Sequence, residues 1–201
     1  MKKKIITGNY YNKFESKKFI EKLLVNRYKY SFIKTIRGLN ISTCFEIGSG
    51  EGNILQLVEN NFLLKLIIGS DIDFDLIHED KIRNKSRNRL ICDAHFLPIG
   101  IKKIDLLLAC EVLEHLSEPQ LFLEECSRID ARYFFFTIPN EPLWRLLNIL
   151  RLKYIKDLGN TPGHMNHWSK NKIRQLISRY LDVKDLFFVQ PWIFIIAQPK
   201  K

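Results

Sequence analysis

The sequence lacks any long apolar run. No segment reaches the roughly 18 uninterrupted apolar residues of a membrane-spanning helix, and the basic residues 1–4 are not followed by the apolar stretch of a signal peptide. Cysteine is also scarce, with four residues and no C-x-x-C pair, which argues against a zinc site or a disulfide framework. We therefore expect a soluble, cytoplasmic protein whose thiols are reduced and mostly buried.

The chain also lacks internal repeats, low-complexity segments and the signature of an RNA-binding module. Its 201 residues suit one α/β domain over 1–201. The formal net charge of +10 would suit a nucleic acid or an anionic membrane. The lysine pairs at 17–18, 102–103 and 200–201 are short and dispersed, however. This dispersal favours a solvated surface; DNA is not an expected partner, and RNA is not excluded.

The most informative segment is 45–53, FEIGSGEGN. Its apolar beginning is typical of a buried parallel strand. Gly48, Gly50 and Gly52 then allow positive φ angles and let the backbone approach a ligand closely, and the free N–H groups of the next helix would face the same ligand. The dinucleotide fingerprint G-x-G-x-x-G would require glycine where Asn53 stands. A nicotinamide-dependent reductase is therefore disfavoured.

Two acidic residues follow further apolar segments. Within residues 66–73 an apolar run ends at Asp71. Asp71 is the preferred candidate for a ribose ligand, and Asp73 is the alternative. A carboxylate at such a strand end can accept both hydroxyls of a ribose. Asp93 comes directly after the next apolar segment, 89–92.

In this order, the segments resemble the motifs of the class I S-adenosylmethionine-dependent methyltransferases. The matches are E-x-G-x-G-x-G at 46–52, G-x-D at 69–71, D-A-x-x-L-P at 93–98 and E-V-L-E-H-L at 111–116. Segments 11–16, 139–144, 158–169 and 191–192 are similar to uncharacterised small methyltransferases of a methyltransferase domain 11/23-like subgroup, which has no settled substrate. The resemblance implies S-adenosylmethionine as the cofactor.

The resemblance also implies which residues hold this cofactor. The glycine loop would hold its methionine side, Asp71 its ribose, and Asp93 with Ala94 its adenine. The predicted cofactor-binding set is Glu46, Gly48, Ser49, Gly50, Gly52, Asp71, Ile72, Asp93, Ala94 and Cys110.

Strand and helix patterns alternate along the chain, which predicts an α/β fold with a doubly wound parallel sheet. The related fold is Rossmann-like, with seven strands, mostly parallel, and an antiparallel final strand. The expected strands are 43–47, 66–71, 89–92, 104–109, 132–138, 183–189 and 193–197, and the expected helices are 15–37, 51–60, 74–85, 118–128 and 169–180. Residues 1–40 form an N-terminal helical segment, in which Tyr10, Tyr11 and Phe14 either close over the cofactor or anchor the first helix.

Residues 139–168 are an irregular insertion after the fifth strand. Within it, 143–156 has the pattern of a basic amphipathic helix. Its position, on the side of the sheet where ligands bind in such folds, predicts a substrate lid. Two alternatives stay open: a lid that also handles a lipid-linked substrate and touches a membrane surface, and a plain packing helix.

Methyl transfer from a sulfonium needs mainly orientation, and a general base only if the acceptor must lose a proton. The base candidates are His115, His164 and His167, each of which could instead make structural hydrogen bonds. The spacing of His164 and His167 could suggest a metal, but no acid stands close to them in the sequence. We expect no metal.

These features predict a methyltransferase for a small-molecule or lipid/glycan-precursor acceptor, with oxygen favoured as the acceptor atom. The alternatives are an RNA or protein methyltransferase and a non-catalytic module that binds S-adenosylmethionine. Against base methylation, the fourth strand is not followed by an N-P-P-[YF] motif. The acceptor and the oligomeric state do not follow from the sequence.

Overall fold

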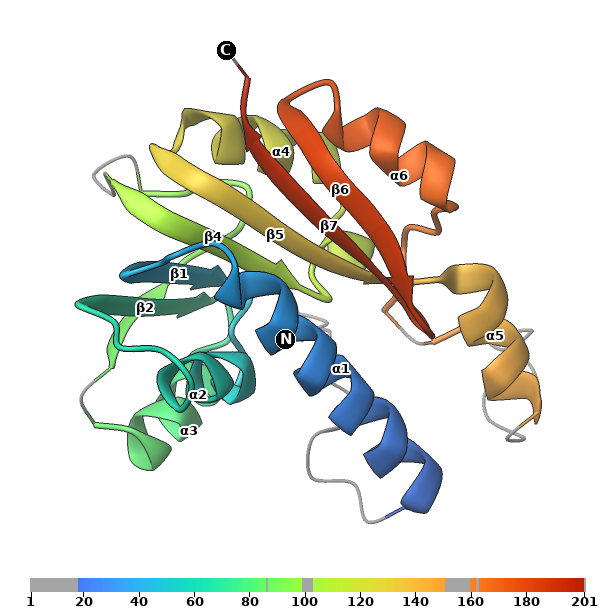
Figure 1. Ribbon diagram of the computed structural model, residues 1–201, viewed down its shortest axis with the longest axis horizontal. Helices are drawn as coiled ribbons and strands as arrows, with labels where there is room; N and C mark the ends of the chain where they lie inside the picture. The colour runs from blue at the N-terminus through green and yellow to red at the C-terminus, as the bar shows by residue number, and fades with distance from the viewer. Residues whose placement is uncertain (1–17, 86, 99–102, 151–159, 162, 201) are drawn as a thin grey trace, which may run out of the picture.

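The computed structural model describes residues 18–85, 87–98, 103–150, 160–161 and 163–200 (Figure 1). The predictions for Tyr10, Tyr11 and Phe14, and for the part of the amphipathic segment beyond Leu150, lie outside the described residues. In the part of the chain that is described, no helix combines the length and apolarity needed to cross a membrane.

A seven-stranded sheet with the order β3-β2-β1-β4-β5-β7-β6 forms the centre of the fold. The first five strands pair in parallel, whereas β7 runs antiparallel to both β5 and β6. The predicted sheet, with its antiparallel final strand, is therefore confirmed. The strands are β1 (Thr43–Ile47), β2 (Leu66–Asp71), β3 (Asn88–Ile91), β4 (Ile104–Cys110), β5 (Ala131–Pro139), β6 (Leu181–Val189) and β7 (Trp192–Pro199).

Helices cover both faces of this sheet (Figure 1). One apolar core joins α4 and α6 to the sheet and contains Phe134 and Phe136, while the other joins α1 and α2 to the opposite face and contains Phe135. Neighbouring side chains of β5 thus point to opposite cores, which is why its sequence is apolar almost throughout. The helices are α1 (Phe19–Arg37), α2 (Asn53–Glu59), α3 (Phe74–Arg83), the short 3₁₀ helix η2 (Leu113–His115), α4 (Pro119–Arg128), α5 (Glu141–Leu150) and α6 (Lys170–Ile177).

Two helices begin two residues away from their predicted starts. Helix α2 begins at Asn53 rather than at 51, because Gly52 has a left-handed φ of 75° that no α-helix contains. Helix α5 begins at Glu141, directly after β5, rather than at 143. The predicted cap of the last helix is confirmed, since the Ser169 side chain accepts a hydrogen bond from the N–H of Lys172 at the start of α6.

The carboxyl ends of β1, β2, β4 and β5 lie along one edge of the sheet, because these strands are parallel neighbours. The glycine loop follows β1, η2 follows β4, and α5 follows β5. In open α/β sheets this edge is where ligands bind, at the point where the strand order reverses. Here the order reverses between β1 and β4.

Candidate active site

The glycine loop after β1 turns sharply against the segment that follows β4. Gly48 has a φ of 69°, and a Cβ atom at this position would lie 2.5 Å from Cγ2 of Val112. Gly52 also has a positive φ, and its missing side chain leaves room for the buried Arg87 and Asp80. Both positions therefore require glycine for backbone conformation and for space.

Asp71 connects this loop to β2. Its carboxylate accepts hydrogen bonds from the N–H of Gly50, at 2.9 Å, and from the N–H of Asp73, at 3.0 Å. Burial raises the pKa of Asp71, partly offset by these two backbone donors. Asp73, the fallback ribose ligand, instead caps α3 by accepting from the N–H groups of Asp75 and Leu76. The structure thus gives the two acids different contacts.

The Glu46 side chain is only 1% exposed and lies on the α1 and α2 face of β1. Its Oε2 atom has no hydrogen-bond partner among the described residues, and neither has the buried hydroxyl of Ser49. Desolvation raises the pKa of Glu46 well above its ordinary value, with the Arg87 charge opposing this shift. Buried polar atoms normally find partners. These two would be satisfied by a polar ligand in the glycine loop, so the loop fits a group with hydrogen-bonding atoms, such as the methionine part of S-adenosylmethionine.

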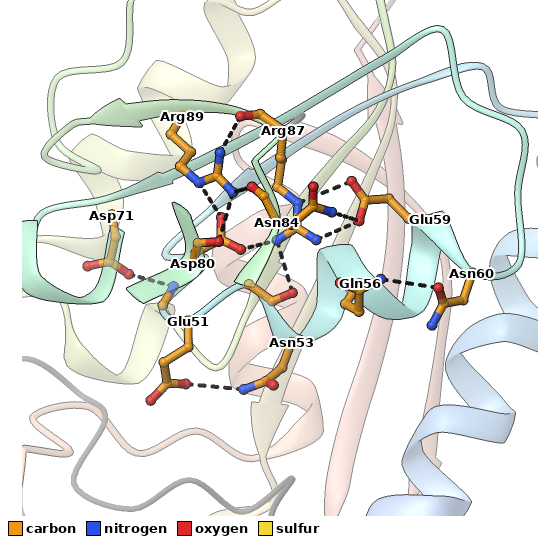
Figure 2. Close-up of polar contacts among 12 residues, drawn as sticks. Glu51, Asn53, Gln56, Glu59, Asn60, Asp71, Asp80, Asn84, Arg87 and Arg89 are labelled. Atoms are coloured by element: carbon orange, nitrogen blue, oxygen red, sulfur yellow. Dashed lines mark hydrogen bonds and ion pairs between the residues drawn. The ribbon is translucent and has the colours of Figure 1, made fainter. Parts of the chain in front are cut away.

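A buried network of charges lies against the end of the glycine loop (Figure 2). Arg87 pairs with Asp80, pairs with Glu59 at 2.6 Å, and donates to the carbonyl of Gly52 at 3.3 Å. Arg89 also binds Asp80, at 2.8 Å. The guanidinium of Arg87 therefore links α2, α3 and β3 to the end of the glycine loop. Sequence reasoning missed this network, because Asp80 and Arg87 look like ordinary surface charges.

The remaining predicted cofactor residues lie on neighbouring strand ends. Asp93 accepts from the N–H of His95 at 2.9 Å, and one of its oxygens lies 2.7 Å from Nδ1 of the same histidine. Ala94 is buried, whereas Ile72 is 40% exposed after β2. The Asp93 side chain is 39% exposed, which leaves it accessible to a ligand.

Cys110 ends β4 as predicted, but its thiol faces the core. The thiol hydrogen-bonds to Tyr28 and Thr137, and desolvation raises its pKa well above the ordinary value. The side chain is thus a buried, uncharged thiol at neutral pH. The contact with the cofactor that is predicted for Cys110 would therefore come from its backbone, and it stays a prediction.

The three predicted histidines gather around the carboxyl ends of β4 and β5. The rings of His115 and His164 lie 4.9 Å apart, edge to face. Nδ1 of His164 lies 2.5 Å from Oε1 of Glu141, and Nδ1 of His167 lies 3.4 Å from Oε2 of the same carboxylate. His164 is buried, whereas the His167 side chain is 36% exposed.

Two acidic residues of this cluster were not predicted from the sequence. Glu141 is the first residue of α5 and is only 3% exposed. Glu114 is fully buried within η2, directly before His115. The expectation that no acid lies near the histidines is therefore wrong for the folded protein, although no acid stands close to His164 and His167 in the sequence. The E-V-L-E-H-L motif held the signal for Glu114, but nothing in the sequence pattern pairs Glu141 with two histidines more than twenty residues away.

Comparisons with known proteins agree with this geometry. Residues 45–131 match a family model described as a methyltransferase domain. The solved structures that resemble the chain include the PH0226 protein from Pyrococcus horikoshii OT3, with 15% identity, a TM-score of 0.73, and coverage of 94% of this chain and 95% of that one. No curated protein matches the chain in sequence.

Two further structures of the same fold have a stated activity. One is magnesium protoporphyrin IX methyltransferase from Synechocystis PCC 6803 with bound S-adenosylhomocysteine, with 16% identity, a TM-score of 0.69, and coverage of 92% of this chain and 89% of that one. The other is the methyltransferase domain of a bacterial Hen1 protein, with 16% identity, a TM-score of 0.70, and coverage of 87% and 99%. At these identities the likeness shows a shared fold.

The family match and the fold together confirm the class predicted from the sequence. Residues 45–131 match a methyltransferase domain and the chain has the fold of the class I S-adenosylmethionine-dependent methyltransferases, which supports S-adenosylmethionine as the methyl donor.

Proposed function

We propose that the protein transfers the methyl group of S-adenosylmethionine to an oxygen atom of a small molecule or of a lipid or glycan precursor in the cytoplasm. The observation that carries this proposal is the position of the histidine and glutamate cluster at the carboxyl end of β4 and β5, beside the glycine loop. An acceptor bound by the cluster would lie next to a cofactor bound by the loop.

In this proposal the cofactor lies across the carboxyl ends of β1, β2 and β4. Oε2 of Glu46 and the hydroxyl of Ser49 are offered to its methionine part, since these two buried atoms lack a hydrogen-bond partner among the described residues. Asp71 accepts from its ribose, and Asp93 with Ala94 holds the adenine. When bound, S-adenosylmethionine supplies an electrophilic methyl group on a sulfonium. The protein's part is then to align the acceptor with it, which is worth about 7–11 kcal/mol.

On the acceptor side, His167 is our candidate for the general base. Its side chain is 36% exposed, and Oε2 of Glu141 lies 3.4 Å from Nδ1, where it can pair with the ring once the ring has taken up a proton. The partly buried His115 and the buried His164 would position the acceptor. Helix α5, which extends from the end of β5 beyond the sheet (Figure 1), is the proposed lid, and segment 143–156 would provide any membrane contact for a lipid-linked acceptor.

The proposal is tested by incubating the protein with S-adenosylmethionine labelled in the methyl group and with separate pools of lipids, polar small molecules, RNA and protein. We expect label in the lipid or small-molecule pool. His167→Gln should slow the transfer by about 10²-fold to 10⁴-fold, whereas His78→Gln, at an exposed position in α3, should not. If no pool is labelled while the cofactor still binds, the protein is a non-catalytic binding module.

RNA is the second candidate acceptor, favoured by the net charge of +10 and by the structural likeness to the small RNA methyltransferase HEN1. Label in the RNA pool, together with RNA binding that weakens steeply with salt, would support this candidate over the first. If RNA does not bind, or if its binding is insensitive to salt, RNA is excluded as the acceptor.

A further inference from the structure

The histidine cluster also brings three groups that can bind a metal ion close together. Glu114, His115 and His164 each offer a ligating atom, and these atoms all lie within 4.8 Å of one another. Glu114 is fully buried and His164 is 7% exposed. Two imidazoles and one carboxylate thus lie close together in a largely buried part of the protein.

Hydrogen bonds fix the tautomers of both histidines in the form that binds metal. Nδ1 of His115 lies 2.9 Å from the carbonyl oxygen of Gly163, which can only accept, so Nδ1 carries the proton. Nδ1 of His164 faces the carboxylate of Glu141 in the same way, at 2.5 Å. In each neutral ring the Nε2 atom then carries the lone pair that a metal ion can share. Metal-binding histidines usually donate their second N–H to a carbonyl or a carboxylate in this manner.

The backbone holds the two halves of the cluster together. The carbonyl of Glu114 accepts hydrogen bonds from the N–H of Met165, at 2.8 Å, and from the N–H of Asn166, at 3.1 Å. The Asn166 side chain also donates to the carbonyl of Leu116 at 2.6 Å. Segments 113–116 and 163–166 are therefore joined on both sides of the ligating groups. A site held in this way needs little rearrangement to bind an ion.

We propose that Glu114, His115 and His164 form a binding site for a divalent transition-metal ion such as Zn²⁺ or Mn²⁺. Two histidines and one carboxylate are a known ligand set for catalytic metals, and they leave coordination positions open. Val112, two residues before Glu114, packs against the glycine loop, so the ion lies at the acceptor end of the site.

An acceptor oxygen bound in an open position would lose its proton more readily. This role for the ion rests on the proposed function, whereas binding of the ion does not.

The test is calorimetric titration of Zn²⁺, Mn²⁺ and Mg²⁺ into chelator-treated protein without S-adenosylmethionine. We expect one ion per chain, with Zn²⁺ or Mn²⁺ bound at least about tenfold more tightly than Mg²⁺, because imidazole suits transition metals. His115→Gln, His164→Gln and Glu114→Gln should each weaken binding about tenfold or more, and Glu141→Gln about 10-fold to 100-fold. His78→Gln, at an exposed imidazole of α3, is the control and should bind normally.

Thermal unfolding provides a measurement that does not depend on variants. The bound ion should raise the melting temperature of the wild-type protein, and a chelator should reverse the rise. Failure to bind a stoichiometric ion, binding of Mg²⁺ alone, or affinity unchanged in both His115→Gln and His164→Gln would overturn the proposal. Because the cofactor is absent from these experiments, their failure would leave the proposed methyl transfer untouched.

Discussion

The burial of the Glu46 carboxylate destabilises the folded protein, as is common for residues kept for function. An ionised carboxylate that is 1% exposed has lost almost all of its hydration. Desolvation accordingly raises its pKa well above the ordinary value of 4.5. Since Oε2 has no partner among the described residues, the side chain makes better sense as a ligand for the cofactor than as a structural group.

Glu46→Gln should therefore affect the stability of the fold and the affinity for S-adenosylmethionine differently. The folded protein holds the Glu46 proton more tightly than the unfolded chain does, because the folded pKa is raised. This contribution to stability is fully present below about pH 4.5 and is lost as the pH rises through the folded pKa. Urea unfolding of both proteins across this range should show the wild type losing stability relative to the variant as the pH rises.

At neutral pH we expect Glu46→Gln to be at least as stable as the wild type, yet to bind S-adenosylmethionine about 10-fold to 100-fold more weakly, since it loses a charge-assisted hydrogen bond. A stability difference that stays constant with pH, or unchanged affinity for the cofactor, would contradict this account of Glu46.

At the scale of whole elements, the glycine loop is held by contacts with the segments that surround it. Gly48 packs against Val112 after β4, Gly50 donates to Asp71 at the end of β2, and Gly52 accepts from Arg87. The loop that follows β1 is thus fixed from three sides. A change in any of these contacts should reach the cofactor site through the loop backbone.

Gly48→Ala should disrupt this loop. The left-handed conformation costs an alanine about 1–2 kcal/mol, and the new Cβ would lie 2.5 Å from Val112. We expect loss of detectable cofactor binding and lower stability in thermal unfolding. Gly38→Ala is the matched control, since Gly38 has a right-handed φ of −75° and its Cβ would meet only the Thr35 carbonyl at 3.9 Å. Equal effects of the two substitutions would refute the role of the loop.

Removal of Arg87 should destabilise the fold strongly. The Arg87 and Asp80 side chains are each 1% exposed, and a buried charge left without its partner costs about 3–5 kcal/mol. Arg128→Ala breaks a pair in which the arginine is 55% exposed, so it should cost no more than about 1 kcal/mol. Urea unfolding of both variants measures the difference. Similar values for Arg87→Ala and Arg128→Ala would mean that the network contributes little.

The sequence predicted the elements better than it predicted the contacts between them. Strand β5 and the glycine loop were found because apolar runs and glycine spacing are local signals. The pairing of Asp80 with Arg87 was not found, because a helical pattern over 74–85 does not show which polar residue turns inward. Glu141 was missed for a related reason: only the sheet topology brings the start of α5 to the histidines after residue 163.

The whole molecule places these parts at one edge of a seven-stranded sheet. The edge combines the loop after β1, the acid at the end of β2 and the histidine cluster after β4 and β5. The strand order reverses between β1 and β4, and such a switch point leaves a crevice for a ligand in doubly wound folds. The central claim is that S-adenosylmethionine binds in this crevice, with Asp71 as a direct ligand.

Calorimetric titration of S-adenosylmethionine into the wild-type protein, beside NADH, tests this claim most directly. Asp71→Ala removes the proposed ribose ligand, and Asp75→Ala removes an exposed acid in the first turn of α3 as the control. The account predicts binding in the micromolar range for the wild type and for Asp75→Ala, loss of binding in Asp71→Ala, and no binding of NADH. S-adenosylmethionine that fails to bind the wild type, or that binds Asp71→Ala equally well, would contradict it.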